Sequence, residues 1–118
     1  MARKGWHILR KPDGLVLTRH LPPRFDVMGH GWLPAGRPLA LAQQIRQDLW
    51  RLLQAQRGFS PVVALTAADT GWQVQAGGRL SGPVAKGLAA RIDDMLQDPK
   101  RRVRWVTQAR RHSEKGLA

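Results

Sequence analysis

The chain has 118 residues, no cysteine, and 20 lysine and arginine residues against 8 aspartate and glutamate residues, which gives a formal net charge of +12. A single domain of this length buries enough surface to fold without a metal or a disulfide, and the lack of cysteine excludes disulfides, iron–sulfur clusters and thiolate zinc sites. No stretch approaches the roughly 20 apolar residues of a membrane-spanning helix, and the apolar run near the N-terminus is too short for a secretory signal, so a cytoplasmic location is the default expectation.

The start of the chain, residues 1–20, has the pattern of a β-hairpin. Two short apolar runs flank the sequence KPDG at residues 11–14, in which proline presets the first turn angle and glycine tolerates a positive φ. Consecutive prolines at positions 22 and 23 then interrupt the pattern, because they supply no amide hydrogens. Alternation resumes over residues 25–33, which we expect to form a third strand.

The most regular stretch, residues 38–56, predicts a long amphipathic helix. Pro38 suits its first turn, where the missing N–H would have no partner anyway, and Gly58 suits a left-handed cap beyond its end. The apolar residues recur every three or four positions and should form one buried stripe, made of Leu41, Ala42, Ile45, Leu49, Leu52 and Leu53. Residues 61–76 follow with the pattern of a second β-hairpin: a β-branched run, a turn and an alternating run.

A second helix is expected over residues 81–97, with Ser81 as its N-cap and Pro83 in its first turn. The residues expected on its buried face are Val84, Leu88, Ile92, Met95 and Leu96. Asp98 should end this helix, because a residue before proline resists the helical conformation. In the basic segment that follows, residues 100–106, apolar residues alternate with arginines as in a half-buried strand.

From about residue 25 the predicted order is therefore strand, helix, strand, strand, helix, strand. This βαββαβ order is that of a ferredoxin-like, two-layer α+β sandwich, with two helices on one face of an antiparallel sheet and the N-terminal hairpin added. We expect a single domain, residues 1–118, with its core at residues 25–107 and a basic, frayed tail at residues 108–118. That architecture hosts many unrelated functions and does not itself indicate one.

The excess of positive charge favours a polyanionic partner. Arginine outnumbers lysine, as the codon usage of a GC-rich genome would produce, but codon usage does not explain the scarcity of acids. The leading hypothesis is a non-enzymatic module that binds nucleic acid, RNA or DNA, mainly through backbone phosphates. The alternatives are a protein-interaction adaptor or homodimeric accessory subunit that recognises an acidic partner and, third, an enzyme of unrecognised type.

The densest basic cluster lies near the C-terminus and should provide most of the nucleic-acid contacts. Its members are Lys100, Arg101, Arg102, Arg104, Arg110 and Arg111. Lysine and arginine neutralise phosphates, and an exposed tryptophan stacks on unpaired bases, so Trp105 is a further candidate, although in a strand its side chain would more often face the core. A second, N-terminal group could extend the patch, although a solvated basic end is the commoner meaning of such a cluster; it contains Arg3, Lys4, Arg10 and Lys11.

The glycine-rich residues 77–82 precede the second predicted helix and could cradle a phosphate with help from Arg79, although they lack the spacing of a P-loop and a plain turn is the commoner meaning. The four histidines are scattered without the spacing of metal ligands. His30 and Asp26 share a strand face, but the rise of a strand separates them by about 13 Å. We therefore expect no metal, no cofactor and no catalytic residue.

Five tryptophans are many for a chain of this length. Most occupy alternating or stripe-edge positions and should lie in the core. Trp32, beside a Gly/Pro loop, and Trp50, at the side of the helical stripe, are candidates for exposure. An exposed tryptophan among arginines is typical of an anchor at a protein interface, which keeps the second hypothesis open.

Overall fold

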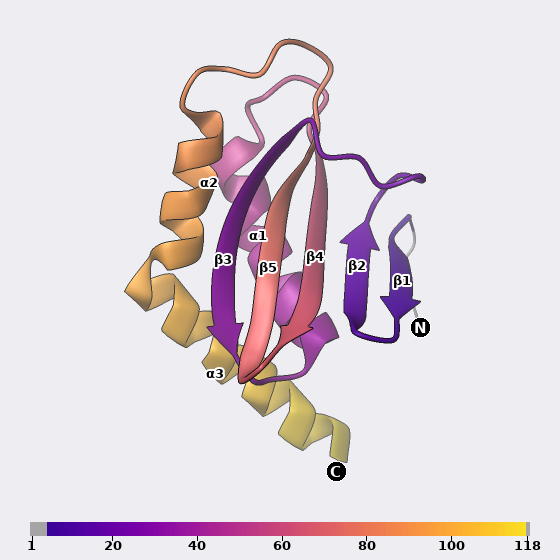
Figure 1. Cartoon of the computed structure of the whole chain (residues 1–118), viewed down its shortest axis with the longest axis vertical. Helices are drawn as coiled ribbons and strands as arrows, with labels where there is room; N and C mark the ends of the chain where they lie inside the picture. Colours follow the sequence, from indigo (N-terminus) through magenta and orange to yellow (C-terminus); the bar gives the residue numbers. More distant parts are fainter. Residues whose placement is uncertain (1–4, 118) are drawn as a thin grey trace.

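Within residues 5–117, whose backbone the computed structural model describes, five antiparallel strands form one sheet and three helices lie on one side of it (Figure 1). Side chains are described for residues 5–111. The strands pair in the order β1-β2-β4-β5-β3 and are β1 (His7–Lys11), β2 (Gly14–Thr18), β3 (Val27–Pro34), β4 (Ser60–Ala68) and β5 (Gly71–Arg79). The helices are α1 (Pro38–Leu53), α2 (Leu88–Gln97) and α3 (Pro99–Leu117).

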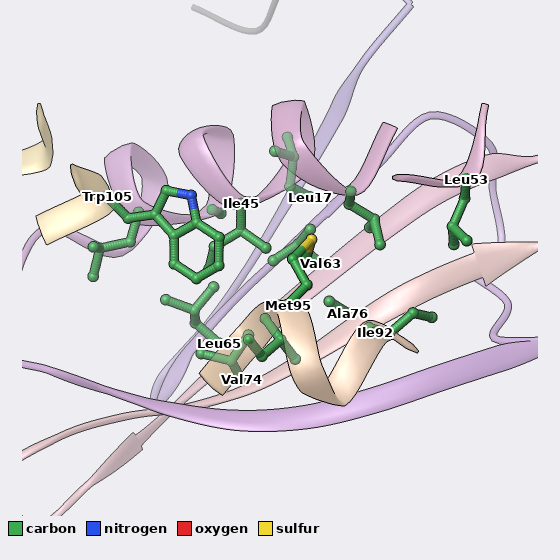
Figure 2. Packing of buried hydrophobic residues seen from close by; sticks show 14 of the residues in the cluster. Leu17, Ile45, Leu53, Val63, Leu65, Val74, Ala76, Ile92, Met95 and Trp105 are labelled. Carbon is green, nitrogen blue, oxygen red and sulfur yellow. The ribbon is translucent and has the colours of Figure 1, made fainter. Parts of the chain in front are cut away.

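Helix α1 and both hairpins form where the sequence predicts them, but α1 ends at Leu53 and not at residue 56. Pro38 occupies its first turn as expected. Its C-cap is Gln54, so Gly58, with a φ of 68°, is not the helix cap and instead lies in the loop before β4. The predicted stripe is buried, except that Leu52 is only partly covered. Each fully buried leucine of this kind contributes about 1.5–3 kcal/mol relative to an exposed one. The stripe packs against apolar residues from the sheet and α2, among them Leu17, Val63, Leu65, Val74, Ile92 and Met95 (Figure 2).

The predicted ferredoxin-like βαββαβ order is wrong, because residues 100–106 belong to helix α3 and not to a strand. Asp98 is extended, with φ −65° and ψ 117°, and its carboxylate accepts the backbone N–H of Arg101 at 3.1 Å. With Pro99 in the first turn, this is the arrangement that starts a helix. The same Asp-Pro pair that ends α2 therefore begins α3. Trp105 and Ala109, four residues apart, are the most buried of its residues with described side chains, as the helical period requires.

Helix α2 also begins later than predicted. Residues 81–87 form a loop, so Ser81 is not an N-cap and Val84 is exposed. Gly87, with a φ of 81°, immediately precedes the helix, and a right-handed helix does not continue through that conformation. The rest of the predicted stripe, from Leu88 onward, is buried.

Two glycines of β3 let α2 approach the sheet closely. A Cβ atom would lie 2.6 Å from the Ile92 side chain if added at Gly29, and 2.8 Å from the Leu96 side chain if added at Gly31. Since side chains alternate along a strand, Trp32 points to the opposite face of the sheet, which no described helix covers (Figure 1).

β3 is an edge strand in the described structure, because no strand follows α2. The carboxylate of Asp93 on α2 accepts the outward backbone N–H of His30 at 2.7 Å. A side chain that occupies an edge donor in this way hinders pairing with a further strand. At the other edge, the sheet is extended by the β1–β2 hairpin, which pairs with β4 through β2.

Helix α3 is attached to α1 by a buried carboxylate. Asp48 of α1 is only 8% exposed, and its Oδ2 accepts the indole N–H of Trp105 at 2.7 Å and a hydrogen bond from Arg104. Its Oδ1 accepts a hydrogen bond from Arg51 at 2.9 Å. The Trp105 ring is fully buried and enters the core cluster beside the residues of α1 (Figure 2).

We expect Asp48→Ala to lower the free energy of unfolding by about 2–4 kcal/mol, because it leaves the buried Trp105 N–H unpaired and removes the partner of two arginines. Urea denaturation followed by circular dichroism measures this. Asp94→Ala removes the same charge from an exposed position of α2 and should change stability by less than about 0.5 kcal/mol. Equal midpoints for the two variants would contradict the role assigned to Asp48.

A second carboxylate, Asp26, fastens the start of β3 to the end of β5. Arg24 donates two hydrogen bonds to it, at 2.9 and 2.8 Å, and the backbone N–H of Leu80 donates another at 2.8 Å. The Arg24 hydrogen bonds, the Leu80 N–H and, more weakly, the charge of Arg79 lower the pKa of Asp26 below its ordinary value.

Because the pKa of Asp26 is lower in the folded than in the unfolded chain, its contribution to stability is present above the unfolded pKa and is lost as the pH falls through the folded pKa. We therefore expect the difference in melting temperature between the wild type and Asp26→Asn to be largest near neutral pH and to shrink below about pH 4. Thermal melts from about pH 7 to about pH 3 measure it. A constant difference across that range would show that protonation of Asp26 has no part in acid unfolding.

Candidate nucleic-acid interface

The C-terminal basic cluster lies on α3, where it faces in several directions. Lys100 and Arg104 are one turn apart and Arg111 is two turns further, so these three residues share one stripe of the helix. Arg101 pairs with Asp98 at 3.4 Å, and the partly buried Arg102 lines a shallow apolar hollow with Val103 and Pro34. Arg110 is exposed on a neighbouring part of the surface.

Trp105 does not belong to the surface of this cluster. Its ring is completely buried and its N–H is bonded to Asp48, so it cannot stack on a base in this structure. Trp105 therefore lies in the core, which was the commoner of its two expected positions, but it belongs to a helix and not to a strand.

The structure adds Arg51 of α1 to the cluster. Arg51 and Arg104 bond to opposite oxygens of the Asp48 carboxylate, and their side chains remain 65% and 48% exposed. Two guanidinium groups beside one carboxylate leave a net positive charge at the surface. In the sequence, the spacing of three residues between Asp48 and Arg51 indicates that the two can pair on one helix. Nothing in the sequence indicates that Arg51 lies near α3.

The surface around these residues is poor in acids. Asp48 is the one acidic residue of α1, and residues 99–111 of α3 contain none. The remaining acids with described side chains lie in turns, on α2, beside Arg24, or at the start of α3 in Asp98. We call the surface formed by Arg51, Lys100, Arg104 and Arg111 the α1–α3 basic face.

The other predicted contacts are not gathered there. Arg10 and Lys11 lie at the turn end of β1, and Arg79 ends β5 close enough to Asp26 to influence its charge. Arg3 and Lys4 lie outside the described residues. Gly77 and Gly78 belong to β5, where an added Cβ would collide with backbone oxygens of neighbouring strands, and the next helix begins only at Leu88. The glycine-rich segment therefore serves strand packing and does not lead directly into a helix.

An aromatic pocket lined with arginine, which the sequence did not indicate, lies where the open end of the N-terminal hairpin meets α1. It has a volume of about 420 Å³ and is lined by Trp6, Arg19, His20, Arg46, Trp50, Phe59, Ser60 and Pro61. We call it the hairpin pocket. Its residues come from four separate segments of the chain, and none of them is acidic.

The uncovered face of the sheet differs in its two halves. Val16, Val62 and Ala64 form a small apolar cluster beneath Phe25 and Leu9. Trp32, 41% exposed, lies in a hollow of about 370 Å³ on the other half, whose lining includes His30, Thr66, Gln73 and Gln75.

Asp26 does not line the hollow that contains His30, and its carboxylate is bonded to Arg24 and Leu80. Among the residues that the structure describes, no group of three or more histidine, aspartate or glutamate side chains is arranged to hold a metal ion. None of the helices in the same part of the chain has the length and apolar character needed to cross a bilayer.

No family model, curated protein or solved structure was found to match this chain, so the arrangement of its own residues must carry any functional argument.

Proposed function

We propose that the protein is a non-enzymatic module that binds nucleic acid, RNA or DNA, through phosphate contacts on the α1–α3 basic face. The observation that carries this proposal is the burial of Asp48 and its pairing with two exposed arginines. Among the acids whose side chains the structure describes, the one at this surface, Asp48, is buried beneath Arg51 and Arg104, so the exposed charge between the two helices is positive.

The spacing of the bases suits an extended polyanion. Along α3, Lys100 and Arg104 are separated by a rise of about 6 Å, and Arg104 and Arg111 by about 10 Å. Side chains spread in this way reach different phosphates of one strand. Contacts to phosphates position a protein without reading bases, so we expect little sequence preference. The net charge of +12 adds long-range attraction to any nucleic acid.

A protein partner is the second candidate, and the exposed Trp32 is the observation that favours it. Tryptophan is enriched among the residues that dominate binding at protein interfaces. The hollow around Trp32 is nevertheless as polar as it is apolar, with two glutamines, a threonine and a histidine in its lining, and it contains no lysine or arginine for an acidic partner to contact. The basic face therefore ranks first.

We expect Lys100→Ala/Arg111→Ala to weaken binding to a fluorescent oligonucleotide and to reduce the slope of log affinity against log salt by about 1.4–1.8, as the loss of two phosphate contacts requires. Both residues are exposed and have no described ion pair, so the fold should persist. Fluorescence anisotropy across salt concentrations, with nuclease-treated protein, measures affinity and slope together.

Lys86→Ala/Arg91→Ala is the matched control, because it removes the same charge from exposed positions in the loop before α2 and on α2. Its salt slope should stay close to that of the wild type. Equal losses in the two double variants would mean that only the overall charge matters and that the α1–α3 face has no special role. Absence of binding by the wild type even at low salt would refute the proposed function.

A further inference from the structure

The hairpin pocket combines aromatic and cationic groups in a fixed arrangement. Trp6 precedes β1, Arg19 and His20 follow β2, and α1 supplies Arg46 and Trp50. The Cζ atoms of Arg19 and Arg46 lie 5.7 and 4.8 Å from the centroid of the Trp6 ring, within the range of cation–π attraction. These contacts hold both guanidinium groups at the pocket before any ligand arrives, which lowers the entropic cost of binding.

Trp50 offers a surface on which a flat ring can stack. It lies against Phe59 with ring centroids 6.1 Å apart and an angle of 15° between the planes, yet 42% of its surface remains exposed. A tryptophan supported in this way cannot easily turn aside. Stacking on aromatic side chains is how many proteins hold unpaired bases, and it tolerates any base because every base has a π face.

Polar groups complete the lining. His20 and Ser60 share a hydrogen bond of 2.7 Å between Nδ1 and Oγ, which fixes the orientation of the imidazole. Arginine that stacks by its plane donates hydrogen bonds from its edge, in the geometry that phosphate accepts. With no acid in the lining, the pocket suits a ligand that is both aromatic and anionic. Its volume of about 420 Å³ lies in the usual range for small-ligand sites.

We propose that the hairpin pocket binds one unpaired nucleotide of a nucleic-acid strand, with the base against Trp50 and a phosphate near Arg19. This inference rests on the proposed function, because the rest of the strand would follow the α1–α3 basic face. Helix α1 connects the two sites: Arg46 and Trp50 line the pocket, and Asp48 and Arg51 face α3. The protein then prefers single strands to duplexes, whose bases are already stacked and paired.

The test compares an oligothymidylate of about 12 nucleotides, a length within the range of known single-strand sites, with an abasic oligomer of equal length. The two probes carry the same phosphates, but the abasic one has no bases. Wild-type protein should bind the oligothymidylate roughly 5- to 150-fold more tightly, the effect of stacking one base. Trp50→Leu should lose most of this preference and retain the salt dependence of binding.

Trp32→Leu is the matched control, since Trp32 is equally exposed but lies on the uncovered face of the sheet. It should keep the full preference for the oligothymidylate. If Trp50→Leu does not fold, as judged by circular dichroism, Arg19→Gln replaces it. Arg19 is exposed at the pocket, and its loss should weaken binding of the oligothymidylate more than binding of the abasic oligomer.

Equal affinity of the wild type for both probes, with a normal salt slope, would overturn the pocket assignment and leave the proposed function standing. A preference that survives Trp50→Leu would overturn it too. Displacement of the oligothymidylate by polyglutamate as readily as by unlabelled oligothymidylate would also count against base recognition and point to an acidic polypeptide. Failure of both oligonucleotides to bind at low salt would remove the pocket assignment and, with it, DNA as the ligand in the proposed function.

Discussion

The attachment of α3 to α1 depends on the hydrogen bonds that the Asp48 carboxylate accepts. The carboxylate joins α1 to α3 by accepting hydrogen bonds from the Trp105 indole, Arg104 and Arg51. A buried carboxylate is unfavourable unless hydrogen bonds and opposite charges compensate its desolvation. In this chain the compensation comes from two arginines that reach it from the surface, and no charged group is left without a partner in the interior that the structure describes.

The residues of α3 differ in whether they bond to Asp48 or extend into solvent. Trp105 and, in part, Arg104 hold α3 in place, whereas Lys100 and Arg111 extend from the same helix with no described partner inside the protein. The chain has few acids, and one of them, Asp48, is buried in the fold. The surface formed by Arg51 and Arg104 above it is correspondingly more positive. Stability and surface charge are therefore linked through a single residue.

Helix α1 organises the candidate functional surface as well as the core. Its apolar stripe faces the sheet, one flank meets α3 at Asp48, and the other flank meets the open end of the N-terminal hairpin at Arg46. The added hairpin thus widens the sheet and also supplies Trp6 and Arg19 to the hairpin pocket. The uncovered sheet face, in contrast, presents a mixed polar and apolar surface around Trp32 and gathers no cluster of arginines among the described residues.

The sequence by itself determined α1 and both hairpins, because long helical periodicity and turn residues act through neighbours in the chain. It also determined the excess of positive charge. The short alternation of residues 100–106 suits either a helix or a strand. Asp98 and Pro99 favour the start of a helix locally, but the tertiary structure adds the buried site beside Asp48, which only the helix fills with Trp105. The hairpin pocket was likewise invisible in the sequence, because its residues lie in four distant segments that only the packing of the hairpin against α1 brings together.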